Sequence, residues 1–163
     1  MKKGILSLAF IFIILNSFGQ NGKINFKENY IVNWKNISDT NYTIYYLQFN
    51  FDPFPMTGTM NINFLDSLKA GKGWTLNKQE KKDLQNIITK KSSFGKGECG
   101  TFYTNAAFVI VKDKTIEGYI DIGCSYGQWN FNPENKIAGM ILSNRGFNLM
   151  TTLLDKINIR KKK

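Results

Sequence analysis

The stretch "AAFVIVKDKTIEGYIDIGC", residues 106–124, decides the fold because it reads as a complete β-hairpin. Its first half, 107–112, is apolar on both faces, which is typical of a central strand. "KDKT" then turns the chain, and the return half alternates strictly between two faces. We expect the core side to hold Ile116, Gly118, Ile120, Ile122 and Cys124. We expect the opposite side to hold Glu117, Tyr119 and Asp121.

Two amphipathic segments on either side of this hairpin predict helices. The first covers residues 77–91, where Asn77 and Glu80 have the spacing of a capping box. The second covers residues 144–158 and begins after Ser143, a typical N-cap residue. An alternating segment at 44–51 adds a further strand. The chain is therefore predicted to be an α+β protein: an antiparallel β-sheet with two main helices, pinned by one disulfide.

The N-terminus has the three-part layout of a secretory signal peptide. Lys2 and Lys3 precede an apolar run, 5–15, and small residues stand at the −3 and −1 positions of a cut before Gln20. The run is shorter than the roughly 20 residues that a membrane-spanning helix needs. We predict a signal peptide over 1–19, a single domain over 20–163, a periplasmic or secreted protein, and no transmembrane segment after cleavage.

The two cysteines of the chain, Cys99 and Cys124, bracket the hairpin. Two thiolates without a histidine would make an unusual metal site, and a redox pair more often has the CxxC spacing. Two cysteines in an exported protein favour a disulfide. Closing that loop would stabilise the fold by about 3–4 kcal/mol in the chain-entropy model. We predict a Cys99–Cys124 disulfide, no metal and no cofactor.

The absence of histidine restricts the chemistry. It excludes Ser-His-Asp and Cys-His nucleophile arrangements. A carboxylate pair remains, but Glu117 and Asp121 are four residues apart on one strand, about 13 Å at 3.3 Å per residue. Glycosidase pairs need roughly 5–9.5 Å. An enzyme would need two carboxylates to converge in a pocket, from the set Asp52, Asp66, Glu98, Asp113, Glu117, Asp121 and Glu134.

The net charge of +10 raises the question of a polyanionic partner. Twenty of the 22 basic residues are lysines, and only Arg145 and Arg160 are arginines. Arginine makes the bidentate contacts to phosphates and bases, whereas lysine acts as a solvated point charge. The composition therefore disfavours nucleic acid as a partner.

The segment "SYGQWNFNPEN", 125–135, is the candidate binding loop. Aromatic side chains alternate there with amides, a combination that suits protein or carbohydrate surfaces. The candidate residues are Tyr126, Gln128, Trp129, Asn130 and Phe131. The alternative is that Trp129 and Phe131 fold back and cap one edge of the core.

The segments "LNKQEKKDLQNII", "GEC", "AAFVIVKDKTIEGYIDIGC" and "LMTTLLDKI" together give the order helix, Cys, β-hairpin, Cys, helix. In this order the chain resembles small exported bacterial proteins of unknown function, from about Trp74 to Ile157. The resemblance implies a fold rather than an activity. We expect an exported, non-enzymatic binding module for a protein or cell-envelope partner. Inhibitor and immunity proteins are examples of this class. The alternative is a small carboxylate-based hydrolase that acts on cell-envelope polymers.

Overall fold

A computed structural model describes residues 26–49, 64–97, 104–123, 127–135 and 141–162. The signal peptide predicted at 1–19 and the two cysteines, Cys99 and Cys124, lie outside these ranges, so export and the disulfide stay predictions. Within the described ranges, no helix is both long and apolar enough to cross a membrane.

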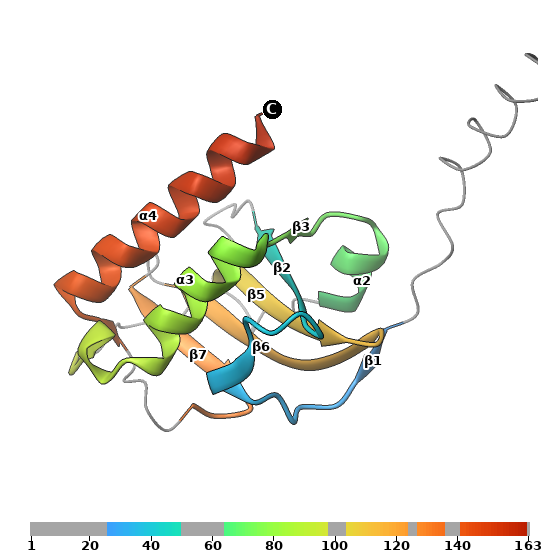
Figure 1. Cartoon of the computed structure of the whole chain (residues 1–163), viewed down its shortest axis with the longest axis horizontal. Helices are drawn as coiled ribbons and strands as arrows, with labels where there is room; N and C mark the ends of the chain where they lie inside the picture. Colours follow the sequence, from blue (N-terminus) through green and yellow to red (C-terminus); the bar gives the residue numbers. More distant parts are fainter. Residues whose placement is uncertain (1–25, 50–63, 98–103, 124–126, 136–140, 163) are drawn as a thin grey trace, which may run out of the picture.

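The described strands form one eight-stranded sheet (Figure 1). Its order is β3-β2-β5-β6-β7-β8-β4, with antiparallel neighbours throughout this path, and β1 pairs in parallel with the start of β6. The strands are β1 (Lys27–Glu28), β2 (Thr43–Gln48), β3 (Trp74–Thr75), β4 (Phe94–Gly95), β5 (Thr104–Lys112), β6 (Thr115–Gly123), β7 (Gln128–Asn132) and β8 (Ile141–Leu142). The antiparallel sheet expected from the sequence is confirmed, and β1 adds one parallel pairing.

The central hairpin β5–β6 is confirmed, together with its turn. Asp113 and Lys114 both have positive φ, 47° and 63°, as a tight hairpin turn requires at its two central residues. The strict alternation expected along β6 is wrong at one point. Val111 pairs with Ile116 whereas Ile110 pairs with Gly118, so Glu117 is an extra residue in a β-bulge. Ile116 consequently packs on the opposite face from Ile120 and Ile122.

Three helices accompany the sheet in the described part of the chain, one more than expected. They are α2 (Phe64–Lys69), α3 (Lys78–Thr89) and α4 (Asn144–Lys161). Asn77 and Glu80 form the predicted capping box of α3, and the Ser143 side chain caps α4 by accepting from the backbone N–H of Gly146.

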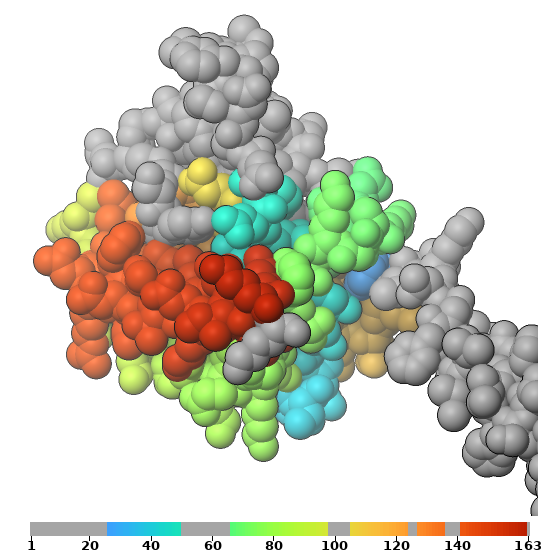
Figure 2. Space-filling model, turned by 90° about the horizontal axis from the view of Figure 1, so that it is seen from above, coloured from blue at the N-terminus to red at the C-terminus, as the bar shows by residue number. Residues whose placement is uncertain are grey.

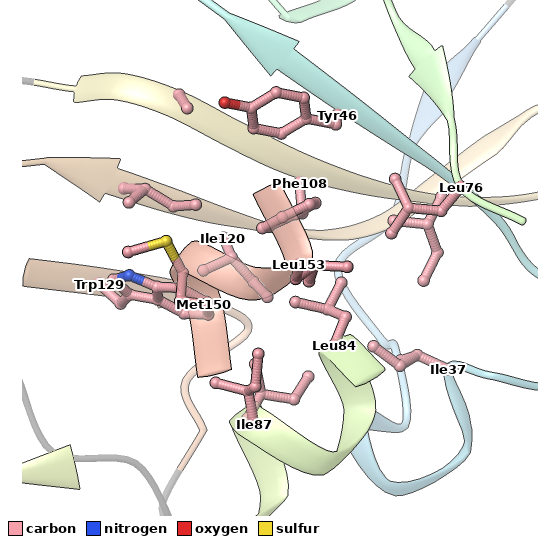
Figure 3. Packing of buried hydrophobic residues seen from close by; sticks show 14 of the residues in the cluster. Ile37, Tyr46, Leu76, Leu84, Ile87, Phe108, Ile120, Trp129, Met150 and Leu153 are labelled. Carbon is pink, nitrogen blue, oxygen red and sulfur yellow. The ribbon is translucent and has the colours of Figure 1, made fainter. Parts of the chain in front are cut away.

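The helices α3 and α4 cover the first face of the sheet. The main core lies between these helices and the sheet (Figure 3). Leu84 and Ile87 of α3 and Met150 and Leu153 of α4 pack there against the sheet. The space-filling view shows α4, in red, lying across the outer surface of the molecule (Figure 2).

The second face of the sheet carries a smaller apolar cluster. It contains Phe26, Leu47, Leu68, Ala107, Val109, Val111 and Ile116. Leu68 belongs to α2, so α2 is the described helix that packs on this face. Most residues of this cluster belong to β2 and β5. The β6–β7 half of the second face carries other side chains.

Candidate functional site

The β6–β7 half of the second face is polar because of the register of these two strands. Tyr119 pairs with Asn132, and Asp121 pairs with Asn130. Asp121 also pairs with Ala107 of β5, a member of the second-face cluster, which places the aspartate on this face. Cross-strand partners point to the same side of a sheet. Tyr119, Asp121, Asn130 and Asn132 therefore form one patch beside the apolar cluster.

Asp121 is the unusual member of this patch. It is half-buried, and its Oδ1 atom is buried without a hydrogen-bond partner in the described structure. Burial disfavours the charged form of a carboxyl and raises the pKa of Asp121 from 3.8 to about 6. Desolvation is the one cause of this shift, so no described cation compensates the charge. An acid in the middle of a sheet without a partner destabilises the folded state.

Asn105 supplies a second unsatisfied oxygen on the second face of the sheet. A register shift between Thr104 and Ala106 makes Asn105 the extra residue of another bulge in β5. The Phe49 backbone N–H donates to the Asn105 carbonyl at 2.9 Å, and Phe49 packs against the second-face cluster. The register with β2 stays regular, since Leu47 pairs with Ala107 and Gln48 with Ala106, so Asn105 lies opposite Phe49 on the second face. Its Oδ1 is also buried without a partner.

Tyr30 completes the patch from the segment that follows β1. Its ring contacts the Tyr119 ring edge to face, with centroids 5.4 Å apart. The Asn132 side-chain amide donates to the Tyr119 hydroxyl at 2.8 Å. Burial, a hydrogen bond to Glu28 and the nearby charges of Glu28 and Asp121 raise the pKa of Tyr30 above its usual value. The negative charge of Asp121 therefore acts on the Tyr30 hydroxyl. We call this group the Asp121 cluster: Tyr30, Asn105, Tyr119, Asp121, Asn130 and Asn132.

The loop expected at 125–135 is wrong for residues 128–132, which form strand β7. Because successive residues of a strand face opposite sides, the side chains of β7 lie on both faces of the sheet. Trp129 is only 1% exposed and lies in the main core beside Met150 (Figure 3). Phe131 packs edge to face against the Trp34 ring at 5.4 Å. The alternative from the sequence, that both rings join the core, is therefore the arrangement of the molecule.

The amide side chains of β7 lie on the opposite face of the sheet from Trp129 and Phe131. Asn130 is exposed and belongs to the Asp121 cluster, while Gln128 is 7% exposed and pairs with Gly123. Tyr126 lies outside the described residues. Of the five candidate binding residues, Asn130 is the one that the structure places in the cluster.

The candidate carboxylates are dispersed. Asp66 lies in α2, Asp113 in the hairpin turn, Glu117 in the β6 bulge, and Glu134 after β7. Asp52 and Glu98 lie outside the described residues. Among the described residues, no other carboxylate contributes to the shifted pKa of Asp121. In the described ranges, no group of three or more His, Cys, Asp or Glu side chains could hold a metal ion.

Sequence patterns place Asp121 on a strand face but say nothing of its burial. The sequence does not indicate that Tyr30 and Asn105 belong to the cluster. Tyr30 comes from an irregular segment, and Asn105 comes from a bulge. No protein-family model, curated protein or solved structure matches the chain.

Proposed function

We propose that the protein is an exported, non-enzymatic binding module that holds its partner on the Asp121 cluster. The partner is a protein or a component of the cell envelope. The observation that carries this proposal is Asp121 itself, a carboxyl in the middle of a sheet whose buried Oδ1 has no partner in the described structure.

The energetic argument rests on the cost of such a group. A buried polar atom without a partner costs about 1–3 kcal/mol. Asp121 and Asn105 each contain one, and they lie on the same face. Residues that lower stability without a structural benefit are typical of functional sites, where activity requires the unfavourable group. The two oxygens are themselves buried, so a partner would contact the exposed amide of Asn130, which lies opposite Asp121.

Two further elements of the proposal come from the sequence. Export rests on the signal-peptide layout of residues 1–19. The disulfide between Cys99 and Cys124 rests on the cysteine count and on the hairpin. Gly123, the residue before Cys124, pairs with Thr104 at the end of β5, which supports a short path back to Cys99.

The alternative is a small carboxylate-based hydrolase that acts on cell-envelope polymers. One observation favours it: a pKa near 6 suits a general acid at neutral pH. The mechanism needs a second carboxylate, which Asp52 or Glu98 would have to supply. Release of reducing ends from envelope polymers, lost in Asp121→Asn, would support this alternative over the binding module.

A capture experiment with matched variants tests the binding module. The purified protein, immobilised, is exposed to a detergent extract of its own cell envelope. Asn130→Ala removes an exposed amide from the cluster, and Asn148→Ala removes an exposed amide from α4, on the other side of the sheet. The proposal predicts a component that wild type and Asn148→Ala retain and Asn130→Ala loses. Equal capture by all three proteins, or none by wild type, would reject it.

A further inference from the structure

We infer that a second surface of the protein, at the C-terminal end of α4, binds the anionic headgroups of a lipid bilayer. This surface, which we call the Trp74 corner, contains Trp74, Lys78, Ile159, Lys161 and Lys162. It lies apart from the Asp121 cluster, because Trp74 pairs with Tyr46, a member of the main core on the first face of the sheet. The inference therefore goes beyond the proposed function and does not depend on it.

The first step is that contacts from α4 hold the corner together. Arg160 donates to the backbone carbonyl of Thr75 in β3 and to the Glu80 carboxylate in the first turn of α3. The Lys161 ammonium lies 4.7 Å from the centroid of the Trp74 ring. The last turn of α4 is thus fixed beside β3 and the start of α3, and these three segments share one end of the molecule (Figure 1).

The second step is the exposure of two large apolar side chains at this end. Trp74 is 41% exposed, and Ile159, in the last turn of α4, is 62% exposed. A tryptophan ring combines apolar area with a polar N–H, which makes it typical of the boundary between lipid and water. Insertion of both side chains into that boundary would remove apolar surface from water. The two side chains therefore favour a partner that has an apolar layer.

The third step is charge. In the described part of the chain, the three lysines of the corner form no ion pair with a carboxylate. Of the described carboxylates nearby, Glu80 is neutralised by Arg160, and Asp155 of α4 offsets one lysine. The corner is therefore net positive and complements an anionic surface. Each lysine close to an anionic bilayer strengthens binding about fivefold.

The fourth step favours a bilayer over a soluble polyanion. Nucleic acids and phosphate polymers supply negative charge but no apolar layer for Ile159. Lysine also lacks the planar set of donors with which arginine recognises phosphates and bases. A bilayer supplies both the anionic headgroups and the acyl boundary beneath them. The corner would rest on the membrane surface through its lysines, with Trp74 and Ile159 inserted between the headgroups.

Co-sedimentation with lipid vesicles tests the inference. The protein, in the form that its native host produces, is mixed with vesicles of phosphatidylcholine alone or of phosphatidylcholine with about one-third phosphatidylglycerol. We expect binding to the anionic vesicles that is at least about tenfold tighter than binding to phosphatidylcholine alone. Sodium chloride should weaken this binding, because salt screens exposed charges.

Four substitutions at the corner locate the binding surface. The double variant Lys161→Gln/Lys162→Gln should weaken binding to the anionic vesicles about tenfold or more, because two lysine contributions are lost. Trp74→Ala and Ile159→Ser should each weaken it about threefold or more, because less apolar area enters the bilayer.

Matched controls make the same kinds of change elsewhere. Lys90→Gln/Lys91→Gln removes two charges at the far end of α3, and Phe147→Ala removes a ring that is 42% exposed near the start of α4. Both control variants should bind within about twofold of wild type. Circular dichroism melting of each variant separates a binding loss from a folding loss.

The inference is overturned if the protein binds neither kind of vesicle, if it binds both equally, or if the corner variants, all folded, bind as wild type does. Single-stranded DNA is the competing occupant, because its bases could stack on Trp74. A DNA oligonucleotide that binds more tightly than the anionic vesicles, without any loss in Ile159→Ser, would overturn the lipid assignment in favour of nucleic acid.

Discussion

At the scale of single residues, the proposed binding site centres on a carboxyl in an unfavourable position. Asp121 faces Asn130 across the strand pair and lies beside an apolar cluster. Its alternation with Ile120 and Ile122 could be predicted from the sequence. Its partial burial could not, because burial depends on which other parts of the chain pack against this face of the strand, and periodicity does not show that.

The raised pKa of Asp121 predicts a pH-dependent stability gain in Asp121→Asn. Burial raises the pKa from 3.8, the unfolded value, to about 6 in the native state. Above pH 6 the native state carries the desolvated charge, whereas below about pH 4 both states are neutral. The variant should therefore be more stable at pH 7, by about 2 kcal/mol after allowance for partial exposure. The gain should disappear as the pH falls from 6 to 4.

Urea denaturation of wild type and variant at pH 7, 5 and 4 measures this effect. Asp155→Asn, at an exposed position on α4, is the matched control and should show little change at any pH. No gain at pH 7, or a gain that persists at pH 4, would contradict the assignment of Asp121 as a desolvated acid.

Trp129 offers a second test at this scale. Its side chain lies in the main core against Phe94 and Phe108, with ring centroids 6.2 Å away in both cases. Trp129→Ala should therefore lower the free energy of unfolding by about 3–5 kcal/mol. Trp74 is 41% exposed, and Trp74→Ala should cost clearly less. Similar small losses in both variants would place Trp129 outside the core.

At the scale of elements, helix ends could be predicted and strand β7 could not. Local capping chemistry fixes the start of α3 at Asn77 and of α4 at Ser143, so the sequence is sufficient there. The stretch 128–132 contains three amides and ends before Pro133, which reads as a loop. It becomes a strand because β6 supplies its ladder and the core supplies a site for Trp129. Tertiary contacts thus override the local preference.

The contact between α3 and α4 gives a prediction at this scale. Arg160 forms two hydrogen bonds to the Glu80 carboxylate, at 3.0 and 2.9 Å, and Glu80 is nearly fully buried. Removing the cation leaves a buried charge without its partner, which is strongly destabilising. Arg160→Ala should cost about 2–4 kcal/mol.

The matched control is Lys156→Ala. The Lys156–Asp83 pair joins the same two helices at 2.7 Å but is exposed, so its loss should cost less than about 1 kcal/mol. Chemical denaturation of the two variants measures the difference. Equal losses would show that the burial of Glu80 has no energetic consequence.

At the scale of the whole molecule, the two faces of the sheet carry different groups. The first face carries the main core and both long helices, whereas the second face carries the smaller apolar cluster and, beside it, the Asp121 cluster. The fold class, the hairpin and the two long helices could be predicted because they depend on periodicity, whereas α2 was not predicted. The face of Tyr119 and Asp121 could be predicted from alternation, but that of Ile116 could not, because the bulge at Glu117 changes which side chains share a face.

The disulfide belongs to this scale because it would join the start and end of the hairpin segment. Thiol labelling of the folded protein without reductant should find neither Cys99 nor Cys124 reactive. Reduction should lower the melting temperature, as expected for a lost loop constraint of about 3–4 kcal/mol. Labelling of both thiols in the folded protein would reject the bridge.

The central claim is that the Asp121 cluster binds the partner, and amide chemical-shift mapping tests it most directly. The ¹⁵N-labelled protein is titrated with the captured envelope component. We predict that the largest shifts fall at Asn105, Tyr119–Asp121 and Asn130–Asn132, with α4 unchanged. Shifts centred on α4 or β3, with the cluster unchanged, would contradict the claim.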